Sequence, residues 1–133
     1  KRLSFYVNYR KVEIPELKGV ASLSEQQIKQ KEGELILKNI KPSDEVILLD
    51  ERGEFFTSEN WARHLERKMT YGAKDIVFVI GGAYGFSQEV YSRANGMLSL
   101  SKMTFSHQII RLIFLEQLYR AFTIIKGEPY HHR

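Results

Sequence analysis

The sequence contains no cysteine, and this absence excludes several kinds of chemistry at once. Thiol nucleophiles, disulfide bonds and cysteine-ligated metal sites all require a residue that the chain does not have. No apolar run approaches the ~20 residues that a membrane-spanning helix needs, and no basic-then-apolar segment opens the chain as a secretory signal would. The 133 residues suffice for one domain with a core of its own. We therefore expect a single cytoplasmic domain.

Acidic residues are missing from a long stretch of the C-terminal half, since no Asp or Glu occurs between Glu89 and Glu116. A dinucleotide site needs an acid about twenty residues after its glycines, to bind the ribose hydroxyls. The segment 81–85, Gly-Gly-Ala-Tyr-Gly, also has neither the spacing of a dinucleotide motif nor the Lys-Ser/Thr pair of a P-loop. The sequence thus argues against an ordinary NAD or FAD site. Glycines after a strand then serve either a tight turn or the close approach of a ligand.

Positive charge is present in moderate excess, with a net charge of +4, and it is concentrated at the two ends. The segment 102–133 contains five Lys or Arg against two Glu, together with three of the four histidines. The first twelve residues contain no acid and four cations, which are Lys1, Arg2, Arg10 and Lys11. Clustered cations suit the binding of phosphates. Ordinary solvated surface charge explains them equally well.

Patterns of strand and helix alternate along the chain. Alternating apolar residues predict a half-buried strand over 5–14, and continuous apolar runs predict buried parallel strands over 46–50, 76–80 and 97–100. Helices are predicted from a Ser24-Gln27 capping box, from Ser58 to Gly72, from Ser87 to Gly96, and over 107–126. Arg52-Gly53 is predicted to turn the chain after the second strand. The alternation indicates an α/β fold with a mainly parallel sheet.

The last predicted helix is apolar around most of its circumference, so it must be buried around most of its circumference. In a domain of this size, a second subunit is the simplest way to bury the apolar surface of this helix. We therefore expect a homodimer, with burial under the domain's own loops as the alternative. The apolar positions are Ile109, Ile110, Leu112, Ile113, Phe114, Leu115, Leu118, Tyr119, Ala121, Phe122, Ile124 and Ile125.

Two of the predicted buried strands lead directly into small or polar residues. The strand 76–80 runs into the glycines, and the strand 97–100 runs into Ser101-Lys102-Met103-Thr104. In open α/β sheets, ligands bind where the chain leaves the carboxyl ends of the strands. A small-molecule site beside a cationic C-terminal tail fits an enzyme that modifies nucleic acid. Two alternatives remain, an α/β nucleotide-binding enzyme of metabolism and a dimeric RNA-binding protein without catalysis.

Four segments in order, 78–86, 98–108, 116–122 and 127–131, resemble the bacterial 23S ribosomal RNA pseudouridine N3-methyltransferases, a family of the SPOUT (α/β-knot) class. The similarity extends from residue 1 to the end of the chain. Family members begin with a further strand upstream of Lys1, so the resemblance implies one SPOUT domain over 1–133 that lacks this first strand. The family commonly has Pro at the position of Ser106, and one His where this chain has His131-His132.

The resemblance implies an S-adenosylmethionine-dependent enzyme without a metal, whose last helix is threaded through a loop as a trefoil knot. It also implies a homodimer that methylates 23S ribosomal RNA on the assembled ribosome. The implied cofactor-binding residues are Leu49, Gly81, Leu100, Ser101, Lys102, Met103, Thr104 and Phe105.

Methyl transfer to N3 requires alignment of the reacting atoms and removal of the imide proton. His131 and His132 are candidate general bases, because the ordinary pKa of imidazole suits this task. Tyr130 is a candidate for stacking on the base, or else for docking the tail. Arg120 is a candidate for a phosphate or interface contact, or else for an ion pair with Glu116.

Overall fold

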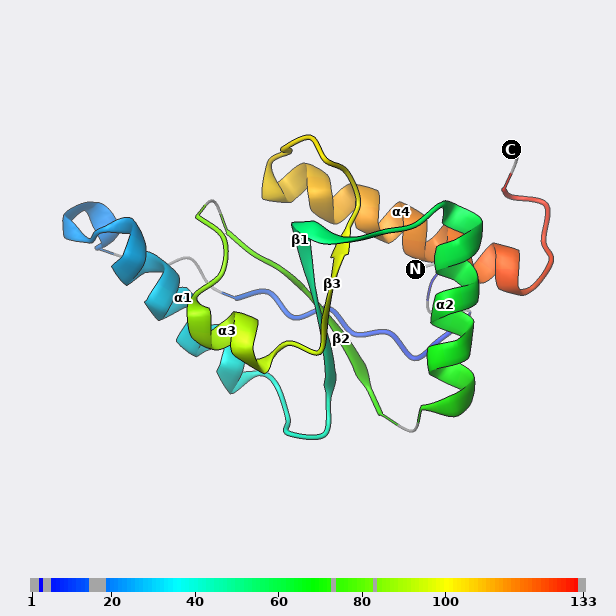
Figure 1. Ribbon diagram of the computed structural model, residues 1–133, viewed down its shortest axis with the longest axis horizontal. Helices are drawn as coiled ribbons and strands as arrows, with labels where there is room; N and C mark the ends of the chain where they lie inside the picture. Colours follow the sequence, from blue (N-terminus) through cyan, green and yellow to red (C-terminus); the bar gives the residue numbers. More distant parts are fainter. Residues whose placement is uncertain (1–2, 4–5, 15–18, 73, 83, 132–133) are drawn as a thin grey trace.

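A three-stranded parallel sheet lies between two pairs of helices in the computed structural model, which describes residues 3, 6–14, 19–72, 74–82 and 84–131 (Figure 1). The strands are β1 (Glu45–Phe55), β2 (Ile76–Ile80) and β3 (Gly96–Ser99), in the order β2-β1-β3. The predicted α/β fold with a parallel sheet is confirmed. The trefoil knot stays a prediction.

The central strand β1 separates two apolar layers, because successive side chains of a strand point to opposite faces. Val46 and Leu48 are fully buried on the face that packs against α1 (Glu25–Lys38) and α3 (Gln88–Arg93). Their neighbours Ile47 and Leu49 belong to the other layer, which contains the apolar residues of α2 (Ser58–Tyr71) and α4 (His107–Ile125). The two faces together give the three-layer arrangement seen in Figure 1.

The helix boundaries follow the capping signals in the sequence. The Ser24-Gln27 capping box is present, with the Gln27 backbone N–H donating to Ser24 Oγ at 3.1 Å and the Ser24 N–H donating to the Gln27 side chain at 2.8 Å. Hydroxyl side chains also cap the other three helices, each accepting a backbone N–H three residues on. These caps are Thr57 for α2, Ser87 for α3 and Ser106 for α4.

Four details of the predicted elements are wrong. Residues 6–14 form no strand, and no described strand pairs with their backbone. Arg52 and Gly53 do not turn the chain, because β1 continues to Phe55 after a shift of register against β3. Gly96 belongs to β3 and does not end α3. All five residues of β2 are only half buried, since β2 is an edge strand of the described sheet.

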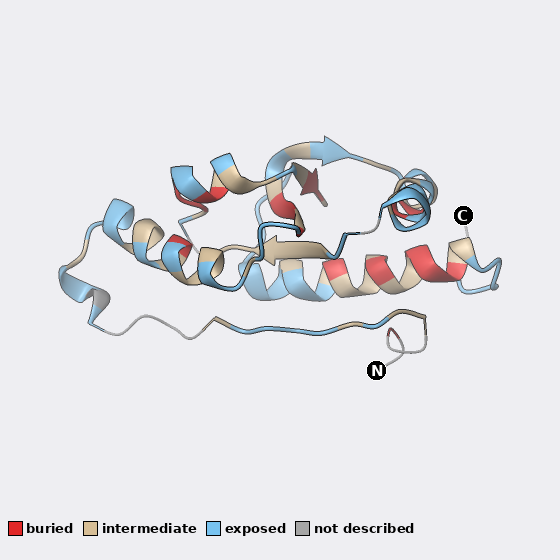
Figure 2. Cartoon of the chain, turned by 90° about the horizontal axis from the view of Figure 1, so that it is seen from below, coloured by how far each residue is buried: buried red, intermediate tan, exposed pale blue. Residues whose placement is uncertain are grey.

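The long helix α4 is buried along only part of its length (Figure 2). Phe114, Leu118 and Phe122 are in the core, and Tyr6 of the N-terminal segment stacks on Phe122 with a centroid distance of 5.8 Å. In the first half of the helix, Leu112 is 61% exposed and Ile109 is 45% exposed. The predicted burial around α4 is therefore incomplete within one subunit. No helix in the described part of the chain is long and apolar enough to span a membrane.

Candidate functional site

β2 and β3 end on either side of β1, close to Leu49, where the pairing of β1 with β2 stops. Leu49 of β1 lies opposite Ile80 of β2 on one side and Leu98 of β3 on the other. Gly81 follows Ile80 directly, and the loop 100–105 follows β3. The sheet thus brings together the three groups of residues that the sequence proposed for the cofactor. We call this region the strand-exit edge.

The loop 100–105 is held by its own hydroxyl side chains and by β1. The Met103 backbone N–H donates to Ser101 Oγ at 2.9 Å, and Thr104 Oγ1 donates to Glu51 Oε2 at 3.1 Å. The Lys102 ammonium lies 4.7 Å from the centroid of the Phe55 ring. These contacts leave Met103 72% exposed. The loop is therefore ordered, with its apolar tip turned to solvent.

The glycines at the end of β2 are places of close contact. A Cβ on Gly81 would lie 3.0 Å from the buried ring of Phe86, and a Cβ on Gly82 would lie 2.9 Å from Oε2 of Glu32 on α1. Gly85 has a φ of +83°, in the left-handed region that favours glycine. The positive φ of Gly85 is that of the predicted turn, and Gly81 and Gly82 are closely approached by side chains of the protein itself. The approach brings in Glu32, which the sequence gave no reason to select.

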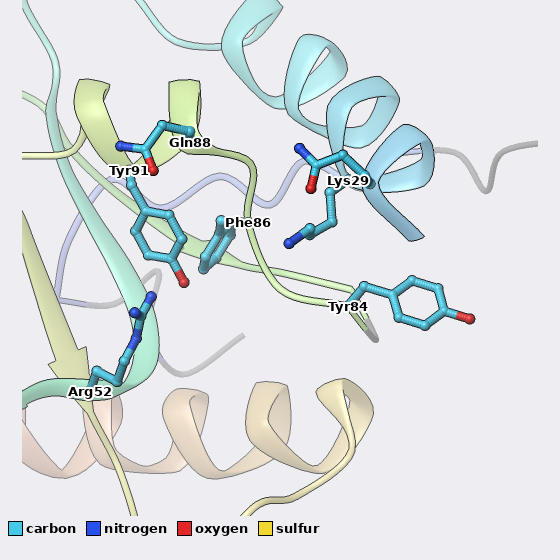
Figure 3. Close-up of a pocket in the computed structure, with 7 residues that line it drawn as sticks. Lys29, Arg52, Tyr84, Phe86, Gln88 and Tyr91 are labelled. Carbon is cyan, nitrogen blue, oxygen red and sulfur yellow. The ribbon is translucent and has the colours of Figure 1, made fainter. Parts of the chain in front are cut away.

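A cleft of about 320 Å³ opens beside this loop, between α1, α3 and the end of β1 (Figure 3). Its lining combines two cations with aromatic rings and side-chain amides. Figure 3 shows Lys29 reaching from α1 toward Phe86, and Arg52 reaching from β1 toward Tyr91. The lining residues are Gln26, Lys29, Arg52, Tyr84, Phe86, Gln88 and Tyr91.

Asp50 accepts hydrogen bonds from two residues that line this cleft, Arg52 and Tyr91. Burial alone would raise the pKa of Asp50, but hydrogen bonds from the Tyr91 hydroxyl and from Arg52 outweigh it and hold the pKa below its usual value. The Arg52 guanidinium also lies 4.8 Å from the centroid of the Tyr91 ring. The ionised carboxylate thus fixes both side chains. The sequence analysis missed all three residues in this role. Asp50 and Arg52 are neighbours on β1, but Tyr91 joins them only when α3 packs beside β1.

A second cluster forms where the C-terminal tail folds back on α4 and α2. The Arg120 guanidinium donates to Glu116 at 2.6 Å and to Nδ1 of His131 at 2.9 Å, and His131 Nε2 lies 2.9 Å from Glu59 Oε2. The Tyr130 hydroxyl donates to Glu116 at 3.1 Å, and this bond raises the pKa of Tyr130. We call these five residues the tail cluster. His132 lies outside the described residues.

The two contacts of His131 define its tautomer. A guanidinium only donates hydrogen bonds, so Nδ1 must accept and the ring proton must be on Nε2, from which it donates to Glu59. Both ring nitrogens are therefore engaged in this arrangement. The predicted ion pair between Arg120 and Glu116 is confirmed. Glu59, on α2, is a member of the cluster that the sequence did not indicate.

The tail cluster and the strand-exit edge lie at opposite ends of α4. The helix begins just after the loop 100–105 and has 19 residues, which corresponds to about 28 Å. Arg120 and the tail are at its far end (Figure 1). Within one subunit the two halves of the predicted site are therefore apart.

Comparison with known proteins identifies the family. A family model described as "Predicted SPOUT methyltransferase" matches residues 1–131. Ribosomal RNA large subunit methyltransferase H of Flavobacterium johnsoniae is 56% identical over 133 residues, which span all of this chain and 85% of that protein. The proteins of the same name from Christiangramia forsetii and Parabacteroides distasonis are 57% and 56% identical, over 99% and 98% of this chain and 84% and 83% of their own lengths. The chain therefore belongs to the SPOUT methyltransferase family.

Proposed function

We propose that this protein transfers a methyl group from S-adenosylmethionine to N3 of a pseudouridine in 23S ribosomal RNA, on the assembled ribosome in the cytoplasm. The observation that carries the proposal is the match, over nearly the whole chain, to proteins named for methylation of large-subunit ribosomal RNA. The geometry supports it, because Leu49, Gly81 and the start of the loop 100–105 lie on or directly after neighbouring strands.

The residues of the strand-exit edge fit this cofactor. Leu49, Gly81 and the loop from Leu100 to Phe105 offer an apolar side chain, backbone groups and glycines that a ligand can approach closely. A cofactor held mainly by backbone groups needs no ribose acid, in keeping with the acid-free stretch of the sequence. When bound, S-adenosylmethionine supplies an activated methyl group. The protein must align N3 with that group, which is worth several kcal/mol in such reactions.

We propose that the tail cluster captures the RNA. Arg120 contacts a phosphate by exchanging its partner Glu116 for the RNA, and Tyr130 presents a ring that is 38% exposed and able to stack on a base. His131 serves as the general base only when Nδ1, the ring nitrogen that carries no proton, leaves Arg120. In the observed arrangement His131 instead positions the tail.

We further propose that the enzyme is a homodimer in which the tail of one subunit serves the strand-exit edge of the other. The length of α4, about 28 Å, separates these parts within one subunit. The first half of α4 and the loop before it expose a set of apolar side chains that a partner would cover. These are Met103, Phe105, Ile109 and Leu112.

The proposal is tested by methyl transfer from labelled S-adenosylmethionine to ribosomes from cells that lack the endogenous activity. We expect label in 23S ribosomal RNA, at one nucleotide that mass spectrometry identifies as N3-methylpseudouridine. A protein that binds ribosomes but not S-adenosylmethionine would instead be a non-catalytic RNA-binding protein. Transfer to a different nucleotide would contradict the proposed substrate and leave the methyltransferase activity standing.

A further inference from the structure

The carboxylate of Glu32 lies directly against the glycines at the end of β2. A Cβ built on Gly82 would lie 2.9 Å from one oxygen of Glu32 and 3.0 Å from the other, so both oxygens rest on the backbone of this glycine. Glu32 is on the inward side of α1, next to the buried Gly33. The carboxylate of Glu32 on α1 therefore lies at the strand-exit edge.

Within the part of the chain that the structure describes, Glu32 has no hydrogen bond or ion pair, although it is half buried. Burial raises the pKa of this carboxyl, and the nearby His107 at the start of α4 offsets the effect only in part. The two carboxylates that follow Leu49 both accept hydrogen bonds. Asp50 accepts from Tyr91 and Arg52. Glu51 accepts from Thr104. Desolvating an unpaired carboxylate is costly unless a cation compensates.

Lys29 provides the opposite charge one helical turn away. Residues three apart are neighbours on the surface of a helix, yet Lys29 and Glu32 form no ion pair with each other. Lys29 is instead directed into the cleft beside the glycine loop (Figure 3). An unpaired cation and an unpaired anion thus flank the same loop. This arrangement is complementary to the ammonium and carboxylate of an α-amino acid.

We propose that Glu32 binds the α-ammonium group of the methionyl part of S-adenosylmethionine, and that Lys29 binds its α-carboxylate. The assignment rests on the proposed function and extends it, because it assigns the amino-acid end of the cofactor to α1. The adenosine end remains with Leu49, Gly81 and the loop 100–105. The ligand's ammonium supplies the partner that the Glu32 carboxylate lacks.

The same unpaired carboxylate has a consequence for stability. The unfolded chain ionises Glu32 at its ordinary pKa, whereas the folded protein does so only at a higher pH. Folding is thus penalised by this group as the pH rises from the ordinary pKa of Glu32 to its higher pKa in the folded protein, and the penalty remains above that window. Replacing Glu32 by Gln should relieve it. The variant Glu32→Gln is therefore expected to fold and to melt at the same temperature as the unliganded wild type, or higher.

The test is calorimetry with three compounds, which are S-adenosylmethionine, S-adenosylhomocysteine and 5′-methylthioadenosine. The first two carry the amino acid, and the third lacks it. Glu32→Gln should weaken the first two about ten- to a hundredfold, as expected for the loss of a charge-assisted hydrogen bond, and leave the third within a few-fold. Lys29→Ala should give the same pattern. Glu34→Gln, an exposed change on the same helix, should change none of them.

Four other outcomes would contradict the assignment, and each has a different meaning. Unchanged binding of all three compounds would place Glu32 outside the cofactor site. Weakening of S-adenosylmethionine alone would assign the carboxylate to the sulfonium and not to the ammonium. Equal weakening of all three would indicate a displaced glycine loop. If the wild-type protein binds none of the compounds, the proposed function fails, and this assignment fails with it.

Discussion

The two ring nitrogens of His131 join three elements that are distant in sequence. Arg120 reaches one nitrogen from α4, and Glu59 holds the other from the first turn of α2. The side chains of His131 and Glu59 are only 16% and 23% exposed, so water competes weakly for this pair. A carboxylate at the start of a helix is also favoured by the helix dipole. Glu59 is therefore well placed to hold the tail in one position.

We predict that Glu59→Ala releases the tail without affecting the cofactor. Loss of the bond to His131 should cost about 1–2 kcal/mol, which is a roughly tenfold increase in local opening. Amide hydrogen exchange measures this at Glu128, whose N–H donates to the Thr123 carbonyl at 2.8 Å where the tail begins. Glu59→Gln keeps an oxygen that accepts from Nε2 and should exchange more slowly than Glu59→Ala. Unchanged exchange in Glu59→Ala, or a change in S-adenosylmethionine affinity, would contradict the positioning role.

At the scale of the element, the boundary between β1 and α2 depends on one glycine. A Cβ on Gly53 would lie 2.6–2.8 Å from backbone atoms of Met97 and Leu98, closer than side chains normally approach. The missing side chain lets β1 come close to β3 where the register shifts, so the strand continues to Phe55. We predicted a turn at this position because glycine is common in turns, and the sequence does not show that β3 passes close to Gly53.

We predict that Gly53→Ala destabilises the protein by about 1–3 kcal/mol, as overpacking against backbone typically does. Urea denaturation followed by circular dichroism measures the change. Gly96→Ala is the matched control, since its Cβ would make only an ordinary contact of 3.5 Å with Ile47 in the same strand pair. Equal stability of the two variants would show that the close approach at Gly53 is not required.

The elements were predictable to the extent that their signals are local. Hydroxyl caps and apolar runs located the four helices and the three strands, although β1 extends to Phe55, beyond its predicted end at 50, and α3 ends at Arg93, before Gly96. The segment 5–14 has the alternation of a strand, but a strand also needs a hydrogen-bonding neighbour, and residues 6–14 have none within the described sheet. Its Tyr6 packs against α4 instead. Pattern alone could not supply this partner.

The functional residues separate in the same way. The strand-exit edge was predictable because parallel strands bring their carboxyl ends together whatever their spacing in the sequence. Glu32 and Glu59 were not predictable, because each is on a helix that is distant in sequence from the other residues of its site. Glu32 is 50 positions from Gly82, and 72 positions separate Glu59 from His131. Only the packing of α1 and α2 on the sheet places Glu32 and Glu59 next to these residues.

For the whole molecule, the exposed half of α4 predicts a dimer. Leu112 is an apolar residue of α4 that is 61% exposed in the single subunit. Leu112→Asp should therefore place a charge in the interface and dissociate the dimer. Sedimentation should show a wild-type dimer at micromolar concentration and a monomeric variant that retains S-adenosylmethionine affinity within a few-fold. Lys38→Asp, exposed on α1, is the control and should remain dimeric. A stable wild-type monomer would contradict the prediction.

If the tail of one subunit completes the site of the other, two inactive variants should restore activity when they are mixed. Arg120→Ala removes the tail function. Gly82→Val blocks the strand-exit edge and should still fold, because its Cβ meets only the movable end of Glu32. After subunit exchange, half of the dimers contain one subunit of each kind, and each of these has one intact site, so about a quarter of the wild-type methyl transfer should return. If each subunit used its own tail, every site would contain a defect, and mixing would restore nothing.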